Sequence, residues 1–128
     1  MPGILFLCIH NAGRSQMAAA FARDLSGGRV DILSGGSEPA DSVNPVAVEV
    51  MTEIGIDISQ FVPQKFNDDL LNAVDVVVTM GCGDTCPYIP GKRYIDWPLD
   101  DPKGRPIEEV RRIRDEIRDR VADLLNQL

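Results

Sequence analysis

Three cysteines carry most of the chemistry available to this 128-residue sequence. The first opens a loop between an apolar run and an alanine-rich, helix-forming stretch, and this loop reads Cys8-Ile9-His10-Asn11-Ala12-Gly13-Arg14-Ser15. Amide groups at the start of a helix lack a partner within the helix, and the aligned peptide dipoles place partial positive charge there. Arg14 adds a planar fork that can bind two oxygens at once. The segment from Ile9 to Ser15 is therefore predicted to bind a tetrahedral oxyanion.

Cys8 is placed to attack such an anion. Only the thiolate is a nucleophile, and a free thiol with a pKa of about 8.5 is mostly protonated at neutral pH. A helix N-terminus, the Arg14 charge and the Ser15 hydroxyl all favour the thiolate, and Asn11 has donors and an acceptor that could hold the loop in shape. The alternative is that Cys8 is only a small buried residue at a strand end. We interpret Cys8 as the nucleophile because thiol, amide groups and positive charge fall within one turn.

The other two cysteines, Cys82 and Cys86, lie in a second loop with Gly81 and Gly83. If the two cysteines lay four residues apart on a helix, their Cβ atoms would be about 5 to 6 Å apart, whereas a disulfide requires a Cβ–Cβ distance of roughly 3.5 to 4.5 Å. A disulfide here needs an irregular, adjustable backbone, which glycine favours. Purely structural cysteines remain an alternative. Zinc binding fits poorly, because the pair supplies two ligands and the sole histidine, His10, lies in the anion loop.

Apolar runs alternate with helix-forming stretches along the chain. We expect strands over residues 3–8, 29–34, 74–80 and 93–97, and helices over residues 15–25, 45–53, 67–73 and from Pro106 to the C-terminus. This order predicts a single α/β domain over residues 1–128, with a four-stranded parallel sheet flanked by helices in three layers. Such sheets bind ligands beyond the carboxyl ends of their strands. Cys8 and Cys82 both follow expected strand ends.

Composition narrows the classes of function. A net charge of −7 and few basic residues make nucleic acid a poor partner. No apolar run approaches the ~20 residues that cross a bilayer, so no membrane role is expected. Three cysteines without a secretory leader predict a cytoplasmic location with reduced thiols. A monomer is the default expectation. The acidic charge also means that local groups must attract an anionic substrate.

The most specific motifs are the first loop extended as Cys8-x2-Asn11-x2-Arg14-Ser15-Gln16-Met17-Ala18, the loop of Cys82 and Cys86, and Asp100-Asp101-Pro102. On these motifs the whole chain resembles the low-molecular-weight tyrosine phosphatase fold, and within it the arsenate reductases that regenerate through an internal disulfide cascade. The resemblance implies that Cys8 is the nucleophile, that Arg14 binds the oxyanion and that Asp101 is the general acid. The choice of Asp101 over Asp100 rests on the family pattern of aspartate followed by proline.

The resemblance also implies a relay of thiols. Cys8 would attack arsenate, Cys82 would attack Cys8 so that arsenite leaves, and Cys86 would then attack Cys82. Thioredoxin, or a similar dithiol protein, would reduce the Cys82–Cys86 disulfide, so that no bound cofactor is needed. Glutaredoxin or a low-molecular-weight thiol stays open as the physiological reductant.

Some positions depart from the family pattern. Lys103 follows the Asp-Pro pair where phosphatases of this fold usually have tyrosine, and aromatic residues make up only 5% of the chain. Hydrolysis of phosphotyrosine or a related ester is therefore the alternative function, and a non-catalytic oxyanion sensor is a third. Carboxylates that bind potassium in some arsenate reductases correspond here to Ala19 and Gln64, so we expect no bound metal. His10 is expected at the mouth of the loop rather than as a catalytic base.

Overall fold

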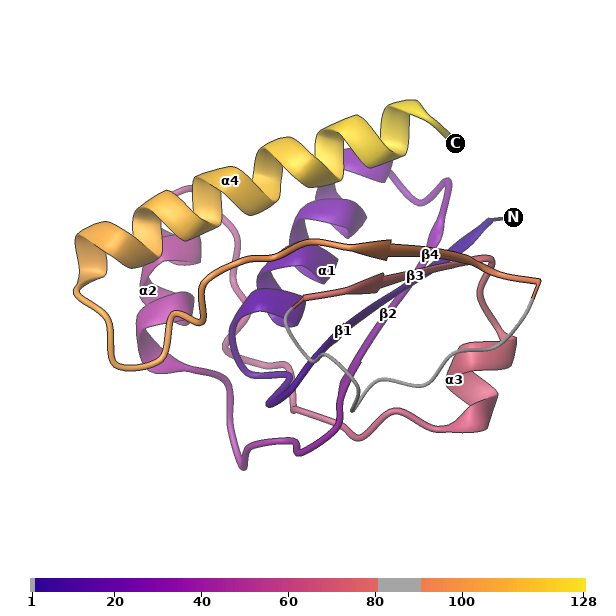
Figure 1. The fold of residues 1–128 in the computed structure, drawn as a ribbon. Helices are drawn as coiled ribbons and strands as arrows, with labels where there is room; N and C mark the ends of the chain where they lie inside the picture. The colour runs from indigo at the N-terminus through magenta and orange to yellow at the C-terminus, as the bar shows by residue number, and fades with distance from the viewer. Residues whose placement is uncertain (1, 81–90) are drawn as a thin grey trace.

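The fold was taken from a computed structural model, which describes residues 2–80 and 91–128 (Figure 1). Strands and helices alternate as the sequence predicts. In chain order the elements are β1 (Gly3–Cys8), α1 (Arg14–Ser26), β2 (Asp31–Gly36), α2 (Pro45–Thr52), α3 (Asp68–Asn72), β3 (Val76–Thr79), β4 (Arg93–Asp96) and α4 (Ile107–Asn126). Asn44 and Asn67 cap α2 and α3, since the Asn44 side chain accepts from the Val46 and Ala47 N–H groups and the Asn67 side chain accepts from the Leu70 N–H.

The four strands form one parallel sheet in the order β2-β1-β3-β4, which confirms the predicted architecture. β1 occupies the interior of the sheet, and all six of its residues are buried. Its register pairs Cys8 with Gly36 of β2 and Leu7 with Thr79 of β3. The carboxyl ends of these three strands therefore meet at one edge of the sheet, where parallel sheets bind ligands.

The sheet is covered on both faces. Helices α1, α2 and α4 lie on one side and the short α3 lies on the other (Figure 1). Because strand side chains alternate between faces, Phe6 and Cys8 join the larger core with the helices α1, α2 and α4, whereas Leu5 and Leu7 join a smaller core with Leu71 of α3. The three predicted layers are therefore present, and the thiol of Cys8 faces the α1 side.

Strand β2 differs from the prediction. The sequence indicates a strand over residues 29–34, but β2 begins at Asp31 and includes Gly35 and Gly36. Glycine usually weakens a strand, yet Gly35 and Gly36 belong to β2 here. Here the lack of a side chain has a steric reason, because a Cβ atom on Gly36 would lie 2.5 Å from the carbonyl oxygen of Ile9. The end of β2 thus packs directly against the predicted oxyanion loop.

Helix α4 is tied to α2 by a buried arginine. Arg114 is 8% exposed, and its Nη1 donates to the carbonyl oxygen of Val50 at 2.8 Å and to Glu53 Oε1 at 3.0 Å. A hydrogen bond from Arg111, followed by weaker effects of Arg111 and Arg114, holds the pKa of Glu53 below its ordinary value. These contacts fix α4 across the larger core, next to the segment that leads to the site.

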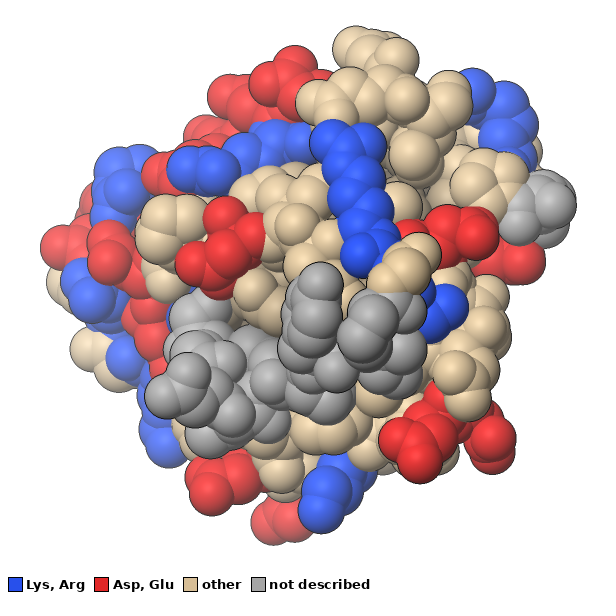
Figure 2. Space-filling model, turned by 45° about the vertical axis from the view of Figure 1, so that its right-hand side comes forward, with Lys and Arg blue, Asp and Glu red and all other residues tan. Residues whose placement is uncertain are grey.

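The surface carries mixed charge. Figure 2 shows acidic and basic side chains interspersed over the face in view, rather than basic side chains gathered in one broad patch. No helix in the described part of the chain is both long and apolar enough to span a bilayer. The expectation that nucleic acid is not a partner stays a prediction.

Candidate active site

The loop after β1 is held from outside by the segment that follows β2. Four carbonyl oxygens of the loop each accept a hydrogen bond from a backbone N–H of that segment. The bonds, written donor to acceptor, are Ser37 to Cys8 at 3.3 Å, Glu38 to Ile9 at 2.8 Å, Ala40 to His10 at 2.9 Å and Asn44 to Ala12 at 2.8 Å. The N–H and C=O groups of a trans peptide point in opposite directions. Carbonyls bonded outward therefore turn the N–H groups of the same peptides inward. The Asn11 N–H confirms this, since it donates to Cys8 Sγ at 3.2 Å.

The start of α1 completes this cradle of amide groups. The helix begins at Arg14, and its N-cap residue, Gly13, has no side chain that could accept a hydrogen bond from the first turn. The uncapped amides and the helix dipole together favour an anion. Gly13 has a second role, because a Cβ atom there would lie 2.7 Å from Cγ of Pro102. Its lack of a side chain lets the segment carrying Asp101 pack directly on the loop.

Cys8 and Arg14 are both buried, at the end of β1 and at the start of α1. Cys8 is a free thiol, 2% exposed, and its Sγ lies 2.8 Å from Ser15 Oγ. Arg14 is 5% exposed, and its Nη1 donates to the carbonyl oxygen of Leu99 at 3.2 Å. Its Nη2 lies 3.6 Å from Asp101 Oδ2. One guanidinium thus contacts the segment that carries the two aspartates at two points, and Arg14 lines the same pocket as Cys8.

The two neighbouring aspartates have different partners. Asp101 lies on the pocket wall, and its Oδ1 accepts the Lys103 N–H at 3.0 Å. Asp100 instead pairs with Arg112 of α4 at 3.2 Å and does not line the pocket. Arg105 Nε donates to the Asp101 carbonyl oxygen at 2.9 Å, and a hydrogen bond to Glu109 is the main cause that raises the pKa of Arg105. The segment is therefore anchored with Asp101 toward Cys8 and Asp100 toward solvent.

These groups meet in one pocket of about 250 Å³. Among the predicted site residues, the pocket is lined by Cys8, His10, Ala12, Gly13, Arg14 and Asp101. Three others lie off the wall: Ile9 packs on the smaller core, and Asn11 and Ser15 are fully buried. Cys82 and Cys86 lie outside the described residues, so their predicted roles stay predictions.

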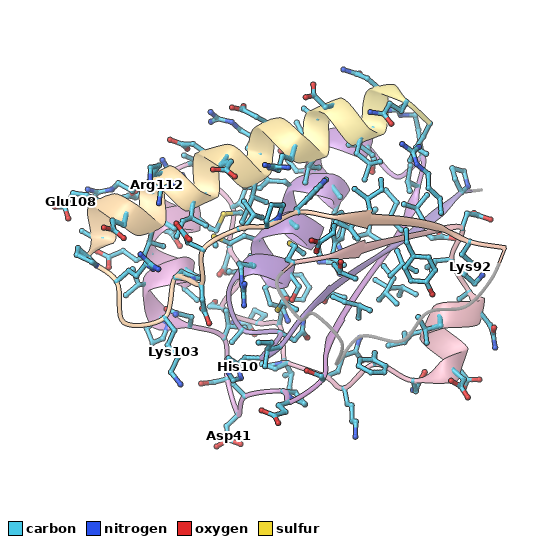
Figure 3. All side chains as sticks on the ribbon, in the orientation of Figure 1. His10, Asp41, Lys92, Lys103, Glu108 and Arg112 are labelled. Carbon is cyan, nitrogen blue, oxygen red and sulfur yellow. The ribbon has the colours of Figure 1, made fainter. Side chains whose placement is uncertain are left out.

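One wall of the pocket has no counterpart among the residues predicted from the sequence. Residues 40–45 contribute Ala40, Ser42, Val43, Asn44 and Pro45 to it. The sequence indicates only a helix from residue 45 here, because hydrogen bonds to carbonyls of a distant loop leave no pattern in the side chains. Lys103 also lines the pocket, and it lies with His10 and Asp41 at the same end of the molecule (Figure 3). His10 Nδ1 is 3.2 Å from the Glu38 carbonyl, so this nitrogen carries a proton and donates.

The described residues contain no group of three or more histidine, cysteine, aspartate or glutamate side chains able to hold a metal ion. At the positions compared with potassium ligands, Ala19 is buried within the larger core and Gln64 Nε2 donates to the Ser34 carbonyl oxygen at 2.8 Å. The absence of a potassium requirement stays a prediction.

A family model described as low molecular weight phosphotyrosine protein phosphatase matches residues 3–128. The chain belongs to this family. Within it, the chain is 46% identical over 128 residues to a putative arsenate reductase of Halobacterium salinarum, covering 95% of this chain and 89% of the relative. It is 34% identical to the glutaredoxin arsenate reductase of Synechocystis, covering 100% of this chain and 99% of the relative.

A solved structure is similar to nearly the whole of this chain. It is a thioredoxin-dependent arsenate reductase of Corynebacterium glutamicum, with 42% identity and a TM-score of 0.87. The match covers 99% of this chain and 61% of that protein's chain. The resemblance found on the sequence motifs is therefore confirmed at the level of family and fold.

The packing of β2 against the oxyanion loop gives a test of the cradle. In Gly36→Ala the new Cβ would meet the Ile9 carbonyl oxygen and, at 3.0 Å, the Asn11 nitrogen, so the loop must shift. We expect phosphate to protect Cys8 from iodoacetamide at least about tenfold less well, since an anion site depends on converging amides. Protection is measured by peptide mass spectrometry.

Gly55→Ala is the matched control. Gly55 has a φ of 83° and no heavy atom within 4 Å of a built Cβ, so this change costs about 1 kcal/mol of stability through backbone strain alone. We expect normal phosphate protection in this variant. Equal protection of Cys8 in the wild type and in folded Gly36→Ala would contradict the proposed geometry.

Proposed function

We propose that this chain reduces arsenate to arsenite, with Cys8 as the nucleophile and one phosphatase-like domain over residues 1–128 as the catalyst. The observation that carries the proposal is the shared pocket of Cys8, Arg14 and Asp101, which come from the end of β1, the start of α1 and the segment before α4. Relatives named arsenate reductase over nearly the whole chain support the choice of arsenate.

In the first step the Cys8 thiolate attacks the arsenic atom of arsenate. A sulfur–arsenic bond forms, one arsenic–oxygen bond breaks, and Asp101 gives its proton to the departing oxygen, which leaves as water. Arg14 and the inward amides of the loop balance the negative charge of the remaining oxygens. Arg14 would exchange its contact with Asp101 for the substrate, which frees that carboxyl group to act as the acid.

The second step is the reduction, and we assign it to Cys82. Its thiolate would attack Cys8 Sγ, so that a disulfide forms and the sulfur–arsenic bond breaks. The bonding electron pair stays on arsenic, which leaves as arsenite. Support comes from β3, which lies beside β1, and from Met80, two positions before Cys82, whose N–H donates to the Leu7 carbonyl oxygen at 2.8 Å.

Cys86 would then attack Cys82, release Cys8 as a thiolate and leave a Cys82–Cys86 disulfide. A dithiol protein supplies the two electrons that reduce this disulfide. Thioredoxin is the partner we propose, because the similar solved protein from Corynebacterium glutamicum is described as thioredoxin-dependent. The name of the Synechocystis relative makes glutaredoxin the alternative donor. We place the enzyme in the reducing cytoplasm, as a monomer without a bound cofactor.

Hydrolysis of phosphate esters is the second candidate, and the family match favours it. Attack by Cys8 on phosphorus would give a phosphocysteine that water completes, without any need for Cys82. The described pocket wall carries no phenylalanine, tyrosine or tryptophan side chain to stack on a phenyl ring, and it carries the exposed Lys103. The wall therefore fits a small inorganic oxyanion better than an aryl ester.

The roles of the two aspartates can be separated by matched changes. Asp101→Asn removes the proposed acid and should lower kcat for arsenate by a factor of about 10² to 10⁴, the usual contribution of a general acid. Asp100→Asn breaks an exposed ion pair with Arg112 and should change kcat less than about threefold. Rates follow from NADPH oxidation with thioredoxin and its reductase. A larger loss in Asp100→Asn would reverse the assignment.

The relay is tested at the second cysteine. Cys82→Ser should abolish multi-turnover reduction of arsenate, because arsenic would remain bound to Cys8, yet it should spare any hydrolysis of p-nitrophenyl phosphate. Cys8→Ser should abolish both reactions. Both are assayed on the same preparations, with the thioredoxin-coupled assay for arsenate. Wild-type arsenate turnover in Cys82→Ser, with thioredoxin as the sole donor, would rule out the relay.

A further inference from the structure

A buried network of amides lies behind Cys8, away from the pocket. Asn11 and Ser15 are 0% exposed and Gln16 is 2% exposed. Asn11 has a φ of 50°, a left-handed conformation that side-chain-bearing residues seldom adopt, so its surroundings must hold it there. Asn11 also donates its N–H to Cys8 Sγ. Whatever fixes Asn11 therefore acts on the reacting thiol.

One backbone donor sets the direction of the whole network. The N–H of Gln64 lies 2.9 Å from Asn11 Oδ1, and a backbone N–H can only donate. The Asn11 oxygen therefore faces Gln64, and its NH₂ group faces Ser15 Oγ at 2.7 Å. Ser15 accepts from Asn11, which leaves its own proton to donate to Cys8 Sγ at 2.8 Å. In this order the hydroxyl stabilises the thiolate.

Gln16 is the second hydrogen-bond donor to the Asn11 side-chain oxygen. Its Nε2 lies 3.2 Å from Asn11 Oδ1. A flipped Asn11 amide would turn its NH₂ group toward the Gln64 N–H and Gln16 Nε2, which both donate, and would offer its oxygen to the Ser15 proton, which would then be lost to Cys8. Two donors to the Asn11 oxygen oppose this flip more strongly than the Gln64 N–H alone. Gln16 thus adds to the energy difference between the two orientations.

We propose that Gln16 is a positioning residue for the Cys8 thiolate, acting through the orientation of the Asn11 amide and the Ser15 hydroxyl. The proposal rests on the proposed function only in that Cys8 is the reacting thiol. Gln16 does not line the pocket, so it contributes to the acidity of the thiol rather than to the recognition of the substrate.

The test measures how alkylation of Cys8 by iodoacetamide depends on pH, in a Cys82→Ser, Cys86→Ser background with a single thiol. Gln16→Met keeps the volume but removes the donor. We expect the midpoint of the pH profile to rise by about one unit, the size of effect that one hydrogen bond to the charged form produces. The charged groups that share the pocket, His10, Arg14, Asp101 and Lys103, are unchanged in every variant.

Two comparisons separate positioning from general damage. Gln60→Met makes the same change at an exposed glutamine and should leave the midpoint within about 0.2 units of the parent, well below the one-unit effect of a lost hydrogen bond. In a Ser15→Ala background, Gln16→Met should lose most of its effect on the midpoint, because the hydroxyl that connects Asn11 to Cys8 is gone. Gln16→Leu, which also lacks the donor and adds no charge, replaces Gln16→Met if that variant does not fold.

An unchanged midpoint in folded Gln16→Met, or a shift of equal size with and without Ser15, would overturn the proposal. The assay contains no arsenate. A chain that failed to reduce arsenate would refute the proposed function and leave the positioning role of Gln16 intact. An unchanged midpoint in Gln16→Met would refute the positioning role and leave the proposed function intact.

Discussion

The site depends on the hydrogen bonds that pull the carbonyl oxygens of the first loop outward. Four backbone N–H groups between Ser37 and Asn44 bind these oxygens, and the opposite ends of the same peptides turn toward Cys8. An acidic chain needs such a local feature, because its overall field repels anions. Gly36 permits this contact, since any side chain there would collide with the loop. The site is thus built by two segments that the sheet order places side by side.

Close packing of two distant segments also forms the other side of the pocket. Pro102 packs where Gly13 has no side chain, and Arg14 binds both the Leu99 carbonyl and the Asp101 carboxylate. We propose that the same guanidinium binds the oxyanion, so that the substrate and the proposed acid would share one side chain as their partner.

Local patterns predicted much of this arrangement, and long-range contacts account for the rest. The Cys8 loop, the helix that follows and the β-branched third strand have signals within a few residues, and each is present in the structure. The pocket wall at residues 40–45 and the buried network of Gln16 were not predicted, because backbone contacts between distant segments leave no periodic signal in side chains. The extension of β2 over Gly35 and Gly36 also depends on a distant segment, because Gly36 packs against the Ile9 carbonyl oxygen.

We propose that the electrons for reduction come from the chain's own thiols. To test this, one equivalent of arsenate is added to the fully reduced protein without any other reductant, arsenite is quantified and disulfides are mapped by mass spectrometry. We expect about one arsenite per chain, a Cys82–Cys86 disulfide and a free Cys8, as two electrons per disulfide require. Three free thiols with no arsenite would show that the thiols do not supply the electrons.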